Sequence, residues 1–247
     1  MGGAKLLGFG VLALFPIAVV FLWANSPLGL WGSVYTILLV GLMPALAVAQ
    51  LPAVEGETLP RVPVYVSSGV VILMLGVGGL ILGTGNFGLE AMGLGSASWA
   101  DVATGTLVLS LAALLLVYLF FFLRKAAGLR ENPLLIQLLP ETPRERTVFF
   151  LLSLAAGFGE ELAYRGFLIP ALTLVFGGEW GAAFVSSAVF GVLHAYQGWL
   201  GIVRTATLGL LLAASFLISG SLWPAIFAHA ILDMVAGLVI GEALVRD

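Results

Sequence analysis

Residues 103–123 read ATGTLVLSLAALLLVYLFFFL, and no charged side chain occurs in this stretch. An α-helix needs about 20 consecutive apolar residues to cross the hydrocarbon core of a bilayer. Arg124 and Lys125 follow directly, where a spanning helix would reach the membrane surface. The stretch therefore predicts a transmembrane helix.

The composition of the rest of the chain matches this stretch. Hydrophobic residues make up 61% of the 247 residues and charged residues 9%, and the mean hydropathy is +1.13. A soluble globular domain carries roughly a quarter charged residues, so this chain could not cover its surface in water. The composition predicts an all-α, polytopic membrane protein.

Two further features of the composition exclude other classes. The chain has no cysteine, which excludes disulfides, iron–sulfur clusters and thiolate metal sites. Its net charge is −3 and no basic patch is present, so nucleic acid is not an expected partner. Residues 1–24 lack a small-x-small cleavage site after their apolar run, which predicts an uncleaved first helix rather than a signal peptide.

Apolar runs separated by Gly, Pro and Asn predict about eight membrane helices. Their expected ranges are 6–24, 31–51, 63–83, 103–123, 147–169, 181–197, 201–219 and 222–242. We expect one membrane domain over residues 1–247, with the helices of 1–123 as a scaffold and 147–242 as the functional core. The loop at 124–146 contains an apolar piece, 134–139, that is expected to lie on the membrane surface as a short amphipathic helix.

The basic residues predict the orientation, because Lys and Arg collect in cytoplasmic segments. A cytoplasmic N-terminus, and with it a cytoplasmic C-terminus, places nine basic residues on the cytoplasmic side: Lys5, Arg61, Arg124, Lys125, Arg130, Arg144, Arg146, Arg204 and Arg246. The opposite loops then hold only Glu90, Asp101 and Glu179, and Arg165 is the one basic residue left inside the membrane.

Three polar clusters interrupt the apolar runs of the second half of the chain. They are Glu160-Glu161-Leu162-Ala163-Tyr164-Arg165, the segment from Phe190 to His194, and the segment from His229 to Asp233. Four unpaired charges at the bilayer centre would cost roughly 10–14 kcal/mol on insertion scales. These side chains must therefore be paired with one another or face a cavity, and we expect them to form one site.

Helical spacing separates the two adjacent glutamates. Glu161 and Arg165 are four residues apart and share a face, so they are expected to form a structural ion pair. Glu160 points about 100° away and has Tyr164 four residues on. Glu160 is therefore the candidate general base.

The two histidines, the only ones in the chain, also have partners at helical spacing. Asp233 lies four residues after His229 and can fix which ring nitrogen points outward. Phe190 lies four residues before His194, so its ring can pack on the imidazole. A hydrogen bond between helices is the plainer role for such a residue, but two histidines near a glutamate pair favour a catalytic role.

The remaining chemistry is hydrolysis by an activated water. No serine lies in a Gly-x-Ser-x-Gly turn, and the HExxH zinc signature is absent. Water activated by a carboxylate and a histidine suits amide hydrolysis, with a second histidine stabilising the oxyanion. Zinc remains an alternative cofactor, with Glu160, His194, His229 and Asp233 as its ligands.

The three motifs, in this order, resemble those of the CAAX protease and bacteriocin-processing family of intramembrane proteases, also termed Abi. The resemblance covers roughly 147–242. It implies that Glu160 and His194 activate water, that His229 and Asp233 stabilise the oxyanion, and that Glu161 and Arg165 support the site. Asp233 stands where CAAX-processing members usually have Asn, and an ionised Asp would orient His229 or bind metal rather than donate to an oxyanion.

The resemblance implies a multi-pass protein of a prokaryotic cell membrane that cuts a membrane-associated or lipidated polypeptide, such as a prenylated CAAX protein. Members have been described both as metal-dependent and as metal-free, so the metal question stays open. A proton- or ion-coupled transporter and a non-catalytic, immunity-type membrane protein are the alternatives.

The expected boundaries raise one conflict. Counted from the cytoplasmic side at about 1.5 Å per residue, Glu160 lies roughly 20 Å into its helix, whereas His194 lies nearer the cytoplasm. The two side chains can meet only if a boundary shifts, a helix tilts, or residues 170–181 dip into the membrane.

Overall fold

The computed structural model describes residues 3–54 and 56–245, which contain helices and loops and no strand. Eight long helical segments follow one another, as predicted. They are α1 (Gly3–Asn25); α2 (Leu30–Ile37) continued by the π-helix η1 (Leu38–Leu42), α3 (Met43–Ala49) and α4 (Leu51–Val54); α5 (Arg61–Asn86); α7 (Trp99–Ala126); α9 (Pro143–Glu161) continued by the π-helix η2 (Leu162–Leu168) and α10 (Ile169–Phe176); α11 (Glu179–Leu193); α12 (Gly198–Ser219); and α13 (Trp223–Leu238). The short elements are α6 (Gly88–Ala91), α8 (Pro133–Gln137), the 3₁₀ turn η3 (Ala195–Gln197) and α14 (Gly241–Val245).

The chain is an integral membrane protein. Five of its helical segments are long and apolar enough to cross a bilayer: 30–54, 61–86, 99–126, 143–176 and 195–219. Three shorter apolar helices, 14–25, 179–193 and 223–238, complete the set among the described residues. Large apolar side chains stay exposed along these helices, among them Leu115, Met74 and Phe184, as expected for faces that contact lipid.

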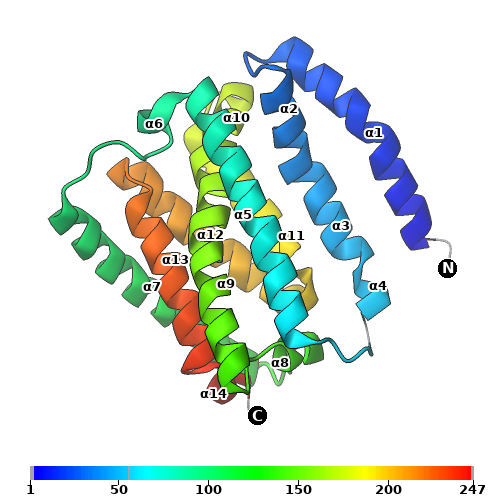
Figure 1. The fold of residues 1–247 in the computed structure, drawn as a ribbon, viewed down its shortest axis with the longest axis vertical. Helices are drawn as coiled ribbons and strands as arrows, with labels where there is room; N and C mark the ends of the chain where they lie inside the picture. Colours follow the sequence, from blue (N-terminus) through cyan, green and yellow to red (C-terminus); the bar gives the residue numbers. More distant parts are fainter. Residues whose placement is uncertain (1–2, 55, 246–247) are drawn as a thin grey trace.

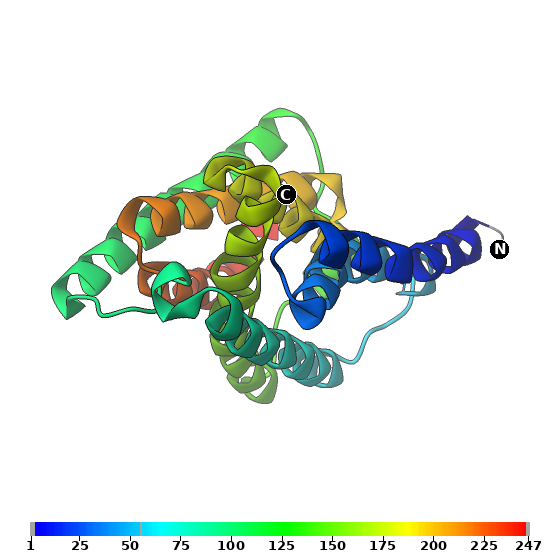
Figure 2. The same cartoon turned by 90° about the horizontal axis from the view of Figure 1, so that it is seen from above.

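The segment from α9 to α10 lies at the centre of the bundle (Figures 1 and 2). Helices α5 and α13 both pack against α9, and α7 packs on the outer side of α13. Seen from above, α1 and α7 lie at opposite edges of the molecule (Figure 2). Any side chain on the inner faces of α9 is therefore enclosed by other helices.

The central position of α9 depends on small residues. A Cβ added to Gly159 would lie 2.5 Å from the carbonyl oxygen of Ile72 on α5, and one added to Gly157 would lie 2.7 Å from that of Ile226 on α13. Small residues let membrane helices approach closely, so that van der Waals packing can hold them together. Two glycines just before Glu160 thus place it between α5 and α13.

Replacing Gly159 by alanine is expected to destabilise the bundle by about 1–3 kcal/mol, because the new methyl group overlaps the α5 backbone. Gly85→Ala is the matched control, since a Cβ there meets nothing within 4 Å. That control is expected to be neutral or to gain about 0.4–1 kcal/mol. Unfolding of both variants in mixed detergent micelles measures the difference, and equal stabilities would contradict the close contact.

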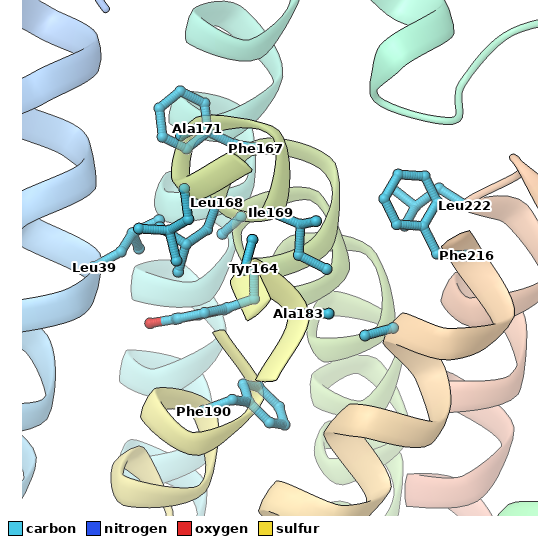
Figure 3. Packing of buried hydrophobic residues seen from close by; sticks show 14 of the residues in the cluster. Leu39, Tyr164, Phe167, Leu168, Ile169, Ala171, Ala183, Phe190, Phe216 and Leu222 are labelled. Atoms are coloured by element: carbon cyan, nitrogen blue, oxygen red, sulfur yellow. The ribbon is translucent and has the colours of Figure 1, made fainter. Parts of the chain in front are cut away.

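The buried core gathers around η2 (Figure 3). Phe167 and Leu168 have no exposed surface, and the Phe167 ring meets the edge of Tyr35 from α2 at a centroid distance of 4.8 Å. Leu39 in η1 is also fully buried in this cluster. The π-helical turn that follows the glutamate pair is therefore packed against α2 and η1.

The predicted end of the fifth helix at residue 169 is wrong, since the helix continues through α10 to Phe176. Pro170 suggested a break because proline cannot donate the hydrogen bond of a helix interior. In the structure it stands in the first turn of α10, directly after η2, where such a donor is not needed. Residues 170–176 thus extend the helix instead of dipping back into the membrane.

Helices α8 and α14 lie at the lower end of the bundle, and α1 begins at the right edge, higher than these two (Figure 1). Arg61 at this end binds Glu141 at 2.6 Å, and the predicted apolar piece at 134–139 overlaps the short helix α8. Arg246 and the side chain of Lys5 lie outside the described part. Which side of the membrane this end faces remains a prediction from the basic residues.

Candidate active site

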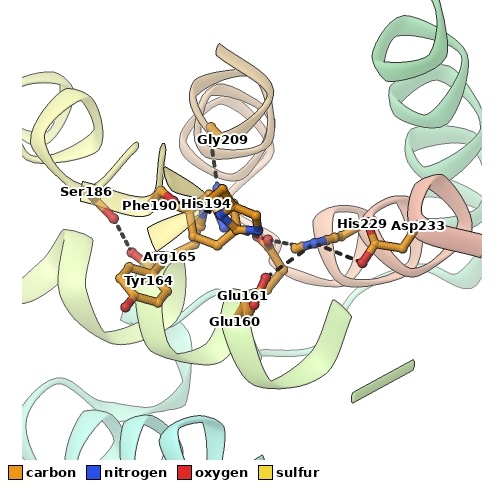
Figure 4. A network of polar contacts seen from close by, with 10 residues as sticks. All are labelled: Glu160, Glu161, Tyr164, Arg165, Ser186, Phe190, His194, Gly209, His229 and Asp233. Carbon is orange, nitrogen blue, oxygen red and sulfur yellow. Dashed lines mark hydrogen bonds and ion pairs between the residues drawn. The ribbon is translucent and has the colours of Figure 1, made fainter. Parts of the chain in front are cut away.

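The three polar clusters predicted from the sequence meet inside the bundle (Figure 4). Glu160 and Glu161 come from the last turn of α9, Arg165 from η2, and His229 and Asp233 from α13. Phe190 lies on α11, and His194 ends that helix. Residues separated by up to 73 positions in the chain are thus neighbours in one site.

A fully buried ion pair lies at the bottom of the site. Arg165 Nη1 donates to Glu161 Oε1 at 2.6 Å, and neither side chain has any exposed surface. Arg165 Nη2 also donates to the carbonyl oxygen of Gly209 on α12 at 3.2 Å, and its guanidinium lies 4.5 Å above the Phe190 ring. The predicted pair at helical spacing is present and connects α9 to α11 and α12.

His229 lies between three carboxylates. Its Nδ1 is 2.7 Å from Glu161 Oε1, while its Nε2 is 3.5 Å from Glu160 Oε2 and 3.7 Å from Asp233 Oδ2. A carboxylate that already accepts from Arg165 can only accept from the ring as well, so Nδ1 is the donor. Glu161 therefore fixes the ring and directs Nε2 towards Glu160 and Asp233.

Exposure separates the carboxylates into two kinds. The Glu160 side chain is 16% exposed and that of Asp233 is 36% exposed, whereas Glu161 is fully buried. Glu160 and Asp233 therefore have surface that is not covered by the rest of the protein, whereas Glu161 has none. The adjacent glutamates have different surroundings, as their helical spacing predicted.

His194 approaches the site from the end of α11. Its Nδ1 donates to the carbonyl oxygen of Phe190 at 3.0 Å, and its ring lies 4.9 Å from the Phe190 ring. The predicted contact at helical spacing is therefore present, and Nε2 is left as the acceptor nitrogen. No direct hydrogen bond or ion pair joins His194 to Glu160 in the described part of the chain; the carboxylate has His229 as its neighbour instead.

The expected conflict in depth disappears with the corrected helix. Glu160 lies 16 residues before the end of α10 at Phe176, and His194 lies 15 residues after the start of α11 at Glu179. At about 1.5 Å per residue both are roughly 22–24 Å from the turn that joins the two helices. Antiparallel helices joined by a short turn bring these two positions to the same level.

Phe190 is the shared apolar surface of the site. Its ring contacts those of Tyr164 at 5.4 Å and His229 at 6.0 Å, besides His194 and the Arg165 guanidinium. Tyr164, expected as a supporting residue, turns its ring away from Glu160 and His229 (Figure 4). It is 1% exposed, so it packs in the core beside the site.

Sequence reasoning missed three contacts between helices. The Glu161–His229 bond and the Arg165–Gly209 bond join residues 68 and 44 positions apart, and Ser186 Oγ donates to the carbonyl oxygen of Tyr164 at 2.8 Å. This carbonyl belongs to the π-helical turn, where the regular ladder of helical bonds is shifted. No local sequence pattern reveals this contact, because Ser186 and Tyr164 lie 22 residues apart.

The zinc site considered from the sequence is not formed by its four expected ligands. His194 forms no hydrogen bond or ion pair with Glu160 or Asp233 in the described part of the chain, so it does not join the pair of carboxylates that His229 Nε2 faces. In the part of the chain that the structure describes, no group of three or more His, Asp and Glu side chains is arranged to hold a metal ion. The residues fit carboxylate and imidazole chemistry better than metal coordination.

Comparison with known proteins agrees with the motifs. Residues 143–235 match the model of a protein family described as type II CAAX prenyl endopeptidase Rce1-like, which confirms the predicted resemblance. The matched segment contains all of the site residues named above, and it supports a hydrolase of the protease class. No curated protein and no solved structure matches the chain.

Proposed function

From a segment that is similar to type II CAAX prenyl endopeptidases, we propose that the protein is an intramembrane endopeptidase. Its substrate is a polypeptide held at the membrane, of the prenylated CAAX type, and it cuts a peptide bond with an activated water. Residues 1–123 act as a scaffold and 147–242 as the catalytic core, since every site residue lies between Glu160 and Asp233. Both termini are on the cytoplasmic side, in keeping with the basic residues.

The observation that carries this proposal is the unequal burial of two adjacent glutamates. Both reach the His229 ring, but only Glu160 has exposed surface. An ion network that only stabilises the fold would be complete with the fully buried Glu161–Arg165 pair, and the partly exposed Glu160 carboxylate would add nothing to it. A reachable carboxylate and an oriented imidazole within a bundle are the parts that water activation needs.

The steps follow from these groups. Glu160 takes a proton from water while the acceptor Nε2 of His194 orients that water, and the oxygen adds to the scissile carbonyl carbon. His229 Nε2–H then donates to the oxyanion, and the carboxylates of Glu161 and Asp233 compensate the charge of the doubly protonated ring. Glu160 returns its proton to the leaving amine as the C–N bond breaks, which restores the carboxylate and gives a new acid and a new amine.

The substrate class is tested with two reporter peptides of one sequence, with and without a prenyl group on the cysteine. Purified protein in lipid nanodiscs is expected to cleave the prenylated peptide at least about tenfold faster, because the lipid places it at the membrane surface. Release of the C-terminal tripeptide, followed by mass spectrometry, measures the rates.

Treatment with a chelator distinguishes metal-free hydrolysis from zinc-dependent hydrolysis in the same assay. Prior treatment with 1,10-phenanthroline is expected to leave the rate unchanged, since the described residues form no metal-binding group. A rate lost on chelation and restored by zinc would contradict the metal-free steps. Equal cleavage of both reporters would contradict the prenylated substrate class but not the peptidase activity.

A further inference from the structure

A second buried ion cluster lies outside the site. Arg204 Nη1 is 2.8 Å from Glu131 Oε1, and Arg124 Nε is 3.6 Å from the same oxygen. The side chains of Glu131 and Arg124 are 4% and 1% exposed, and that of Arg204 is 14% exposed. Taking ionised groups out of water costs several kcal/mol each, so such a cluster is a poor means of stabilising a fold. Its contacts indicate another role.

Arg204 connects this cluster to the turn that follows His194. Its Nη2 donates to Gln197 Oε1 at 3.0 Å, and Gln197 Nε2 donates to the Tyr196 hydroxyl at 3.1 Å. The backbone N–H of Gln197 in turn donates to the carbonyl oxygen of His194 at 2.9 Å. A continuous series of contacts thus runs from Glu131 through Arg204 and Gln197 to His194.

The turn that follows His194 is short. It is a single 3₁₀ turn, and it ends at Gly198 with φ +79°, a left-handed conformation that favours glycine. Asn132, next to Glu131 in the chain, lies beneath it, because a Cβ added to Gly198 would be 3.4 Å from Asn132 Nδ2. The loop that carries Glu131 therefore meets the turn directly at Asn132, and Glu131 reaches Gln197 through Arg204.

We propose that Glu131 and Arg204 are positioning residues for His194. Their ion pair holds Gln197, and through it the turn of residues 194–198, so that the His194 ring stays against Phe190 at the level of Glu160. This inference rests on the proposed function, in which His194 orients the attacking water. A misplacement of about 1 Å can cost about a hundredfold in rate.

The sharpest test removes the link and keeps the ion pair. Gln197→Ala is expected to lower kcat by about ten- to a hundredfold while KM changes by less than about threefold, because the substrate is bound but the water is misplaced. Gln197→Glu keeps an acceptor for Arg204 and is expected to retain kcat within about threefold of wild type. Arg144→Gln is the control, since this exposed arginine lies outside the cluster.

Hydrogen exchange gives a readout that does not depend on activity. The backbone amides of His194 and Gln197 are expected to exchange at least about tenfold faster in Gln197→Ala and Arg204→Gln than in wild type or Arg144→Gln. If wild type cleaves no peptide, the proposed function fails, and exchange still decides whether the turn is held. Wild-type exchange and wild-type kcat in Gln197→Ala would overturn the positioning role, even if Arg204→Gln fails to fold.

Discussion

Replacing Glu160 by glutamine is expected to lower kcat by about a hundred- to ten-thousandfold, because the amide cannot take a proton from water. The substitution keeps the size of the side chain and its place beside His229 Nε2. Since Glu160 is partly exposed and outside the fully buried ion pair, the free energy of unfolding should change by no more than about 1 kcal/mol. Steady-state kinetics with the prenylated reporter and unfolding in detergent measure the two effects.

Glu179→Gln is the matched control for this variant. Glu179 is exposed in the first turn of α11, far along that helix from His194, and should be replaceable without loss of kcat. A Glu160→Gln protein that remains within about threefold of wild type would remove Glu160 from the chemistry. The fall must appear in kcat, since a change confined to KM would indicate a role in binding alone.

Replacing Arg165 by methionine is expected to destabilise the protein by about 3–5 kcal/mol, the largest stability effect foreseen. The substitution leaves the buried Glu161 carboxylate with His229 but without the arginine charge, and it removes the bond to the Gly209 carbonyl oxygen. Methionine keeps much of the apolar stem and its contact with Phe190, so the loss reports mainly the charge. Unfolding of the variant in mixed micelles measures it.

The double variant Arg165→Met, Glu161→Gln separates charge from packing. Neutralising the buried carboxylate should recover at least about half of the lost stability, since neither remaining group is then a buried unpaired charge. The kcat of the double variant should stay well below that of wild type, because glutamine holds His229 Nδ1 less firmly than a carboxylate does. A double variant as unstable as Arg165→Met would show that packing, not the buried charge, causes the loss.

The helices could be predicted because the bilayer imposes their length and composition. An apolar run such as 103–123 has one stable state in lipid, so the spans follow from hydropathy alone. Their ends follow less well, because a proline such as Pro170 suggests a break, whereas a π-helical turn lets the helix continue to Phe176. The π-helical turn is buried among other helices, and these contacts cannot be read from the local sequence.

The site could be predicted within each helix but not between helices. The pairs Glu161–Arg165, Phe190–His194 and His229–Asp233 follow from a spacing of four residues on one helical face. The bond from Glu161 to His229 depends instead on how deeply α9 and α13 overlap, which the close contact at Gly157 determines. The sequence therefore predicted which side chains gather in this part of the bundle, while the neighbour of Glu160 proved to be His229 and not His194.

Cleavage of the prenylated reporter in water enriched in ¹⁸O tests the central claim most directly. Mass spectrometry of the shortened peptide should show one ¹⁸O atom in its new carboxylate with wild type and with Glu179→Gln. Glu160→Gln should give at most about one hundredth of that product in the same time. Equal amounts of labelled product from Glu160→Gln and wild type, or no product from wild type, would contradict water activation at Glu160.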